Sequence, residues 1–326
     1  MAWREDSALT CEVSIVIPTF NRRPILEEVL RALDAQENAP PFEVLVVDDG
    51  SSDGTSEWLG EWLGERSSRR SGPIPVHLLR QQNRGPAAAR NRGVEAAVGA
   101  VIAFLGDDTI PGSGWLAAHL AAHRARPGMR LAVIGHTAWH PRMRQTAFLR
   151  HINEYGLQFG YALIQDPENV PFNFFYTSNL SLARQLLVEE PFDESFPFPA
   201  WEDIETSFRL FRRGMRLVYE PHALAFHDHP TDFDRFCGRQ EEAGFSAAIF
   251  FRKHPELRSF LGIGPAGPAP LPSRLLQRAR EGLVRSLQFL PVSFPGIWDR
   301  ALRFHYLRGL HRAWREGSSG TERVGS

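Results

Sequence analysis

The chain has 326 residues, 43% of them hydrophobic, and a formal net charge of -1. Length and composition exclude a minimal domain and a disordered chain, and they fit one large α/β domain with an appendage, or two domains. The near-neutral charge gives no argument for a nucleic-acid partner. No apolar run reaches the roughly 18 residues of a membrane-spanning helix. Together with the charged start of the chain, this predicts a cytoplasmic protein. Cys11 and Cys237 are expected to be free thiols in a reducing compartment.

Short apolar runs alternate with helix-like segments over the first 135 or so residues. The runs are β-branched and too short for helices, which indicates buried strands. The predicted strands are 13–18, 42–48, 74–80, 100–105 and 131–137, and the predicted helices are 24–36, 53–66, 86–98 and 115–126. This alternation predicts an α/β fold with a Rossmann-like, mainly parallel sheet flanked by helices.

Polar clusters follow four of these predicted strands, at the point where each strand ends. They are residues 19–21, 48–52, 83–85 and 107–108. In parallel sheets, ligands bind beyond the carboxyl ends of the strands. The sequence therefore predicts a ligand site at this edge of the sheet.

The rest of the chain is less regular. From about residue 140 to 199 we expect loops over the site, with room for an edge strand. A helix at 201–213 ended by Gly214, a short strand at 215–219 and a helix at 232–254 follow. The predicted domains are a catalytic domain at 1–230, a helical segment packed on it at 231–261, a Pro/Gly linker at 262–273 and a helical C-terminal extension at 274–326.

The segment 274–316 carries apolar residues at helical spacing and nine arginines against three acidic residues. Two interpretations stay open. The segment can form a basic amphipathic pair of helices with peripheral contact to the inner face of the cell membrane. It can equally pack on the catalytic domain or on a second subunit. The sequence does not indicate the oligomeric state.

Two pairs of adjacent carboxylates end predicted strands. Asp48 and Asp49 precede a Gly-Ser turn and suit ribose hydroxyls or the N–H of a base. Asp107 and Asp108 follow a buried run, where two carboxylates repel each other unless a cation is present. Hard cations such as Mg²⁺ or Mn²⁺ take oxygen ligands and bridge to phosphates. The alternative for both pairs is a turn with a helix cap.

Three further groups carry chemistry. Glu202 and Asp203 open a helix, which suits a general base but also the helix dipole. His227 and His229, two apart on an extended segment, face the same way, and one of them can bind a metal. A helix start near Asn83, Arg84 and Gly85, with Arg90 and Asn91, attracts a diphosphate.

Together these segments resemble the family 2 glycosyltransferases, which have the GT-A fold. The resemblance covers about residues 12–230. The matching stretches are VSIVIPTFNR (13–22), FEVLVVDDGSSDGT (42–55), NRGPAAARNRGV (83–94), AFLGDDTIPGSGWL (103–116), TSNLSLAR (177–184) and WEDIETSFRLFRRGMRLVYEP (201–221), then His227.

The resemblance implies a metal-assisted, inverting transfer from a nucleotide sugar, with Mn²⁺ or Mg²⁺ as cofactor and a UDP-linked donor the commoner case. The implied acceptor is a hydroxyl of a glycan or lipid-linked saccharide. The nucleoside pocket would be lined by Pro18, Thr19, Asn21, Asp48 and Asp49, of which Asp49 would contact the nucleobase.

The remaining positions match motif by motif. Asn83 and Arg90 would support the nucleotide. Asp108 would be a metal ligand and Asp107 would hold ribose or assist the metal, although Gly106 stands where many members have the first Asp. His227 matches the family's late metal-binding histidine, with His229 as its rival. Asp203 matches the catalytic base, and Glu202 contacts the acceptor.

Other classes fit less well. A dinucleotide oxidoreductase needs a GxGxxG turn after the first strand, and this chain has Pro-Thr-Phe-Asn there. A nucleotidyltransferase would carry a Gly-rich basic loop at the same place. A non-catalytic nucleotide-sugar-binding module needs no base at Asp203. The transferred sugar and the linkage are not readable.

Overall fold

The computed structural model describes residues 11–68, 74–154, 156–289 and 294–321. Contacts between residues divide the chain into two compact units. The first consists of Met1–Met143, Ile164–Glu194 and Thr206–His229, and the second of Arg144–Leu163, Ser195–Glu205 and Pro230–Ser326. The second unit includes residues 144–163 and 195–205 of the predicted catalytic domain as well as the predicted linker 262–273.

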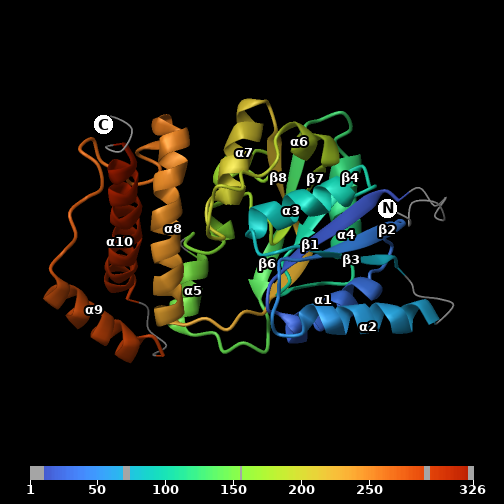
Figure 1. The fold of residues 1–326 in the computed structure, drawn as a ribbon, viewed down its shortest axis with the longest axis horizontal. Coiled ribbons are helices and arrows are strands. Elements are labelled where there is room, and N and C mark those ends of the chain that lie inside the picture. The colour runs from blue at the N-terminus through green and yellow to red at the C-terminus, as the bar shows by residue number, and fades with distance from the viewer. Residues whose placement is uncertain (1–10, 69–73, 155, 290–293, 322–326) are drawn as a thin grey trace. The chain divides into compact units, whose positions relative to one another are not determined.

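The first unit is built on one sheet, in which eight described strands run in the order β3-β2-β1-β4-β7-β6-β8-β5 (Figure 1). The strands are β1 Val13–Thr19, β2 Phe42–Asp48, β3 Val76–Arg80, β4 Val101–Leu105, β5 Thr109–Pro111, β6 Leu131–Trp139, β7 Asn179–Ala183 and β8 Arg216–His227. The neighbours within β3-β2-β1-β4 are all parallel. The predicted parallel sheet and its α/β class are therefore confirmed for this half.

Helices cover both faces of the sheet because strand side chains alternate between them. Ile15 and Ile17 share a buried cluster with Leu26 of α1 and Trp115 of α4. Val16 points the other way, where the close approach of α3 leaves no room for a Cβ at Gly93. The helices of the first unit are α1 Arg23–Asp34, α2 Thr55–Ser68, α3 Pro86–Ala96, α4 Trp115–Arg124 and α6 Arg184–Glu189. The first unit also contains the short 3-10 turn Phe172–Phe174, and α7 Glu202–Arg212 begins in the second unit.

The middle segment differs from its prediction. β7 lies inside the sheet, antiparallel to both β4 and β6, and is no edge strand. β8 runs twelve residues instead of the short strand expected at 215–219. The amide of Asn179 explains the position of β7: its Nδ2 donates to the carbonyls of His136 and Ala223, at 3.1 and 2.9 Å. One buried side chain thereby ties β7 to its neighbour β6 and to β8 beyond it.

A buried chain of hydrogen bonds joins α4 to β7. The Asn179 Oδ1 accepts from Trp115 Nε1 at 2.7 Å and pairs with His119 Nε2 at 2.9 Å. Ser181 Oγ lies 2.9 Å from both His119 Nδ1 and His123 Nε2. Because an amide oxygen only accepts, His119 donates through Nε2. Burial favours the neutral form of both imidazoles, and a neutral His119 accepts from the Ser181 hydroxyl through Nδ1.

This relay predicts acid sensitivity. Burial lowers the pKa of His119 and of His123 from 6.5 to about 4. The folded-state pKa of each histidine lies below its unfolded-state value, so these groups do not lower the free energy of unfolding above pH 6.5. The free energy of unfolding decreases as the pH falls toward 4, by up to roughly 3 kcal/mol for each histidine. Denaturant unfolding across this range should show that slope, and His119→Gln should flatten it. The control is His222→Gln, at an exposed histidine, and it should keep the wild-type slope. A wild type whose free energy of unfolding does not change with pH would contradict the relay.

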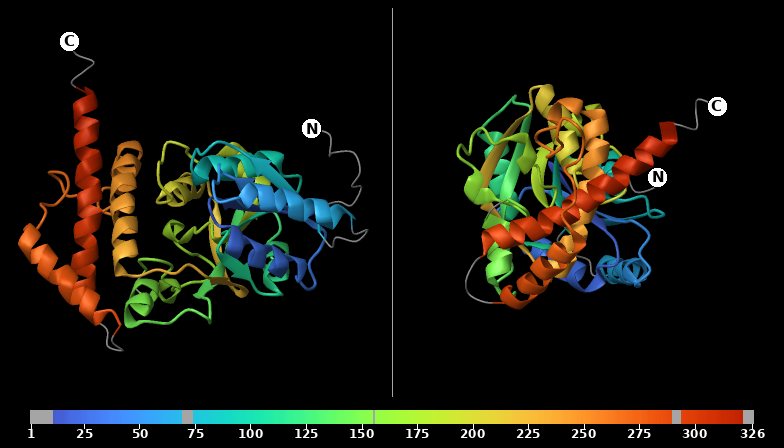
Figure 2. Two further views of the ribbon diagram at one scale, coloured as in Figure 1. Left: turned by 60° about the horizontal axis from the view of Figure 1, so that its bottom comes forward. Right: turned by 90° about the vertical axis from the view of Figure 1, so that its left-hand side faces the viewer.

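The second unit is helical. It contains α5 Ala147–Glu154, α8 Phe233–Lys253, α9 Arg274–Leu287 and α10 Pro295–Thr321, with short 3-10 turns at Tyr161–Leu163 and Pro255–Leu257. α8 and α10 lie side by side (Figures 1 and 2). Their backbones meet so closely that a Cβ at Gly244 or Gly309 would lie 1.8 Å from a carbonyl oxygen of the other helix. Among the described helices, none combines the length and the apolar character that crossing a membrane requires.

Candidate active site

The carboxyl ends of β1 and β4 bring the first predicted residues together. Thr19 ends β1, and its hydroxyl donates to Asp107 Oδ2 at 2.8 Å. Asp107 and Asp108 follow β4 directly, and the Gly106 amide donates to the carbonyl of Ser178 at 3.1 Å. The acidic pair therefore stands at the sheet edge where the sequence places a ligand site.

Two histidines reach Asp108 from β8 and the residues after it. β5 pairs with β8 so that Thr109 lies opposite His227, and the Asp228 amide donates to the Asp108 carbonyl at 2.8 Å. Asp108 Oδ1 lies 3.3 Å from His227 Nε2, and Oδ2 lies 3.2 Å from His229 Nδ1. Both imidazoles thus face one carboxylate, as their spacing of two residues on an extended segment requires.

Arg22 distinguishes the two histidines. Its Nη1 lies 2.7 Å from His229 Nδ1 and 3.8 Å from Asp108 Oδ2. Because a guanidinium stays protonated and only donates, His229 Nδ1 accepts from it. The ring of His227 is more enclosed, with its centroid 5.3 Å from that of Trp139. The lone pair of His229 is therefore directed at Arg22.

The acidic pair is unequal in its ionisation. Burial and the neighbouring charge of Asp108 raise the pKa of Asp107 to about 7. Burial also opposes the charge of Asp108, but chiefly the imidazole of His227 outweighs it and holds the pKa of Asp108 well below the ordinary value. The surroundings therefore stabilise the charged form of Asp108 but not that of Asp107. A cation beside the pair would lower the pKa of Asp107.

Gly106 explains why the acidic motif lacks its usual first carboxylate. A Cβ at this position would lie 2.7 Å from Thr109 Oγ1 and 3.2 Å from Asp108 Oδ1. The hydroxyl of Thr109 and the carboxylate of Asp108 therefore occupy the space that a side chain would need.

Gly106→Ala is expected to lower the free energy of unfolding by about 1–3 kcal/mol, since a methyl group there forces the packed neighbours apart. Chemical denaturation measures the difference. Gly114→Ala is the matched control, because a Cβ at Gly114 meets nothing within 4 Å. Equal stability of the two variants would contradict the packing at Gly106.

The predicted nucleoside residues form a rigid pair of loops. Asn21 has a left-handed φ of 56°, and its Oδ1 accepts from the Ser52 amide at 2.7 Å. Asp48 accepts from the Ser51 amide at 2.9 Å and from the Ser56 hydroxyl. Asn21 thus joins the loop after β1 to the loop after β2, Asp48 holds the latter loop to the start of α2, and Pro18 pairs in register with β2.

Asp49 holds the segment before α3. Its Oδ1 accepts from Gln81 Nε2 at 2.8 Å and from the Arg84 amide at 2.9 Å, and its Oδ2 accepts from the Gly85 amide at 2.9 Å. The segment includes Asn83, which is exposed. On α3, the guanidinium of Arg90 lies over the ring of Phe192, 5.4 Å from its centroid. The structure thereby gives Asp49 a role in fixing this loop that the sequence did not indicate.

Glu202 and Asp203 begin α7 in the second unit. Trp201, just before them, has a left-handed φ of 73° and donates from its indole to the Ala243 carbonyl at 2.9 Å. Glu202 is buried, and Asp203 is half-buried with Oδ1 accepting from the Ile204 amide at 2.8 Å. The unusual backbone at Trp201 persists because the surrounding structure fixes it.

Three residues that the sequence patterns did not indicate contact the predicted site residues or their elements. Arg22 is the last residue of the VSIVIPTFNR stretch, so its place in that motif could have indicated it as a site residue. Arg142 pairs with Asp228 and, at 2.9 Å, with Glu28. In the second unit, His254 Nε2 lies 2.8 Å from Glu205 of α7. The last two contacts join distant segments, and no local pattern indicates them.

The donor groups at the sheet edge suit a divalent cation. Asp108, His227 and Asp107 supply carboxylate and imidazole donors of the kind that Mn²⁺ accepts, and burial together with the charge of Asp108 raises the pKa of Asp107. Among the described residues, however, no three His, Cys, Asp or Glu side chains are already arranged to hold an ion. The donor set fits a divalent cation, and its geometry is not that of a formed metal centre.

Known proteins share the sequence of this chain in part. The profile described as Glycosyl transferase family 2 matches residues 14–182. The pre-mycofactocin glycosyltransferase of Mycobacterium tuberculosis is 28% identical over 90% of this chain and 63% of its own length. The validoxylamine A glucosyltransferase of Streptomyces hygroscopicus subsp. limoneus is 28% identical over 75% of this chain and 57% of its own. The chain thus spans less than two thirds of these relatives.

Solved structures show the same fold. The mannosyltransferase PcManGT from Pyrobaculum calidifontis, in complex with GDP-Man and Mn²⁺, has a TM-score of 0.59 at 19% identity, covering 92% of this chain and 86% of that one. S. aureus TarS 1-349 in complex with UDP has a TM-score of 0.53 at 15% identity, covering 94% and 92%. The GT-A fold expected from the sequence is confirmed. Because the family profile matches more than half of the chain, this protein is a member of glycosyl transferase family 2.

Proposed function

We propose that this protein is an inverting glycosyltransferase that moves a sugar from a UDP-linked donor to a hydroxyl of a glycan or lipid-linked saccharide, assisted by Mn²⁺ or Mg²⁺. The observation that carries the proposal is the group at the sheet edge, where Asp108 lies 3.3 Å from His227 and Asp107 accepts from Thr19 at 2.8 Å. Family membership and the named activities of the relatives support the donor class.

Asp108 and His227 are proposed to hold the metal. His227 is preferred to His229 because the Nδ1 of His229 accepts from Arg22 at 2.7 Å. A bound cation supplies a positive charge that stabilises the leaving diphosphate. The structurally similar PcManGT was solved as a complex with GDP-Man and Mn²⁺, which supports a metal in this fold.

The donor's nucleoside is proposed to bind at the loops after β1 and β2. Pro18, Thr19, Asn21, Asp48 and Asp49 would line its pocket, with Asp107 toward the ribose. The rigidity of these loops supports this role, because preformed loops bind a ligand at a smaller loss of conformational entropy. Asn83 and Arg90 would support the nucleotide near the start of α3, where backbone N–H groups and an arginine favour an anion.

Asp203 is proposed as the general base and Glu202 as an acceptor contact. In one displacement, the acceptor oxygen bonds to the anomeric carbon while the bond from that carbon to the diphosphate oxygen breaks. The bonding electron pair leaves with the diphosphate, and the hydroxyl proton passes to the Asp203 carboxylate. The half-buried position of Asp203 at a helix start supports a carboxylate that is accessible.

The test is release of nucleoside diphosphate from a panel of UDP, GDP and dTDP sugars, with and without Mn²⁺ and a saccharide acceptor, with proton NMR of the product's anomeric centre. Inversion with a UDP sugar is the expected result. Retention of configuration would reject the single displacement. Formation of nucleotide sugars from nucleoside triphosphate would indicate a nucleotidyltransferase, and tight binding without turnover would indicate a binding module.

A further inference from the structure

The helix α9 exposes an apolar face. Leu275 is 81% exposed, Leu276 46% and Leu283 45%. At about 100° per residue these three side chains fall on one side of the helix. Leu271 and Phe289, which flank α9, are exposed as well. Of the twelve large apolar side chains that are exposed in the described part of the chain, these five fall within nineteen residues. Such a concentration marks an interaction surface.

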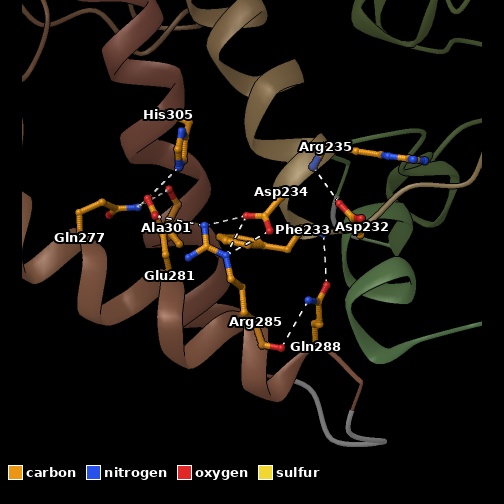
Figure 3. A network of polar contacts seen from close by, with 10 residues as sticks. All are labelled: Asp232, Phe233, Asp234, Arg235, Gln277, Glu281, Arg285, Gln288, Ala301 and His305. Carbon is orange, nitrogen blue, oxygen red and sulfur yellow. Dashed lines mark hydrogen bonds and ion pairs between the residues drawn. The ribbon is translucent and has the colours of Figure 1, made fainter.

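The opposite side of α9 buries Gln277 and Val284 and carries polar contacts to the neighbouring helices (Figure 3). Gln277 Nε2 donates to the Ala301 carbonyl at 3.3 Å, and Gln288 Oε1 accepts from the Phe233 amide at 3.2 Å. Glu281 Oε1 lies 3.0 Å from His305 Nε2. These contacts hold α9 against α8 and α10 by its polar side chains. The helix is therefore oriented with Gln277, Glu281 and Val284 inward and with Leu275, Leu276 and Leu283 outward.

α10 behaves in the opposite way. Trp298, Ala301, Leu302 and Leu310, which share its apolar face, are all buried. The two interpretations left open for 274–316 therefore have to be considered separately for α9 and for α10. α10 packs within the second unit, as its contacts with α8 show, and only α9 keeps its apolar face outward.

Arginines border this face. Arg274 and Arg278 lie on one side of it and Arg280 on the other, at the helical spacing of about 100° per residue. Arg274 and Arg278 are exposed, and on this fully described helix no acidic side chain falls among the leucines. Arg285 lies on the same side as Arg274 and Arg278 and is already paired with Asp234 of α8 at 2.8 Å. A row of leucines between basic side chains complements acyl chains beneath anionic headgroups, and the arginine stems can reach upward to the phosphates.

We propose that α9 docks this protein on a bilayer surface that contains anionic lipid, with Leu275, Leu276 and Leu283 among the acyl chains. A second copy fits the face less well, because a two-fold contact would place the same arginines of both copies together. The proposal goes beyond the proposed catalytic function and does not depend on it.

Co-sedimentation of the full chain with vesicles tests the proposal. Phosphatidylcholine vesicles containing phosphatidylglycerol should bind the protein, and pure phosphatidylcholine vesicles much less. The triple variant Leu275→Ser, Leu276→Ser, Leu283→Ser should bind at least about tenfold more weakly, and Arg274→Gln with Arg278→Gln should remove the preference for phosphatidylglycerol. Leu163→Ser, at an exposed leucine of the same unit, is the matched control and should bind like the wild type.

Thermal melting checks that each variant folds, which is expected because the substituted side chains are exposed. No binding of the wild type to phosphatidylglycerol vesicles, or equal binding by the triple variant, would overturn the proposal. Light scattering is measured in parallel. Self-association that the triple variant abolishes, without vesicle binding, would assign the face to a second copy and would equally overturn it.

Discussion

Asp108→Ala should lower sugar transfer by roughly a hundredfold to a thousandfold, because it removes the carboxylate proposed to hold the cation at the leaving diphosphate. In the structure this carboxylate contacts both His227 and His229 and has its pKa held well below the ordinary value. The measurement is nucleoside diphosphate release under saturating metal. Metal-dependent binding of the nucleotide should fail in the same variant, which separates this effect from a loss of chemistry alone.

The matched control is Glu61→Ala, which removes an exposed carboxylate from α2 and should leave transfer unchanged. His227→Ala should reproduce the loss seen with Asp108→Ala, and His229→Ala should affect metal binding less, since Arg22 engages its Nδ1. A larger loss of metal affinity in His229→Ala than in His227→Ala would reverse the proposed assignment of the ligand.

Asp203→Asn should reduce turnover by about a hundredfold to ten-thousandfold while donor affinity stays as in the wild type. The amide cannot take the acceptor proton, but its oxygen can still accept from the Ile204 amide, as Asp203 Oδ1 does at 2.8 Å. The structural contact is therefore retained and the melting temperature should not change. Steady-state transfer and calorimetric binding of the donor, measured on the same preparation, distinguish catalysis from binding.

Unchanged turnover in Asp203→Asn would remove this residue from the mechanism. Loss of donor binding together with turnover would instead assign Asp203 to the donor site. Glu202→Gln adds a second comparison. As a proposed acceptor contact, it should raise the KM for the acceptor more than it lowers kcat, because Glu202 is not the proton acceptor.

The parallel half of the fold was predictable because its signals are local. β1, β2 and β4 are short β-branched runs, each followed by polar residues and a helix with apolar spacing, so strand ends and site residues could be placed together. β7 was not predictable in this way. Its antiparallel position between β4 and β6 depends on Asn179, whose partners His136 and Ala223 lie more than forty residues away in the chain.

The site shows the same division. Asp107, Asp108 and His227 could be selected from adjacent charges and from their resemblance to a family motif. The contact of Arg22 with His229, 207 residues further along the chain, could not be derived from spacing. α9 and α10 are the clearest case. Both carry apolar residues at helical spacing between arginines. The contacts of Gln277, Glu281 and Gln288 with distant segments show which side of α9 packs inward, and no local pattern indicates them.

The central claim is that a cation held by Asp108 and His227 binds a nucleotide donor at this sheet edge. The most direct measurement is isothermal calorimetry of UDP, GDP, dTDP and CDP with the wild type and Asp108→Ala, each with and without Mn²⁺. We predict that UDP binds the wild type only when Mn²⁺ is present and does not bind Asp108→Ala. Equal binding with and without metal, or by both proteins, would contradict the account.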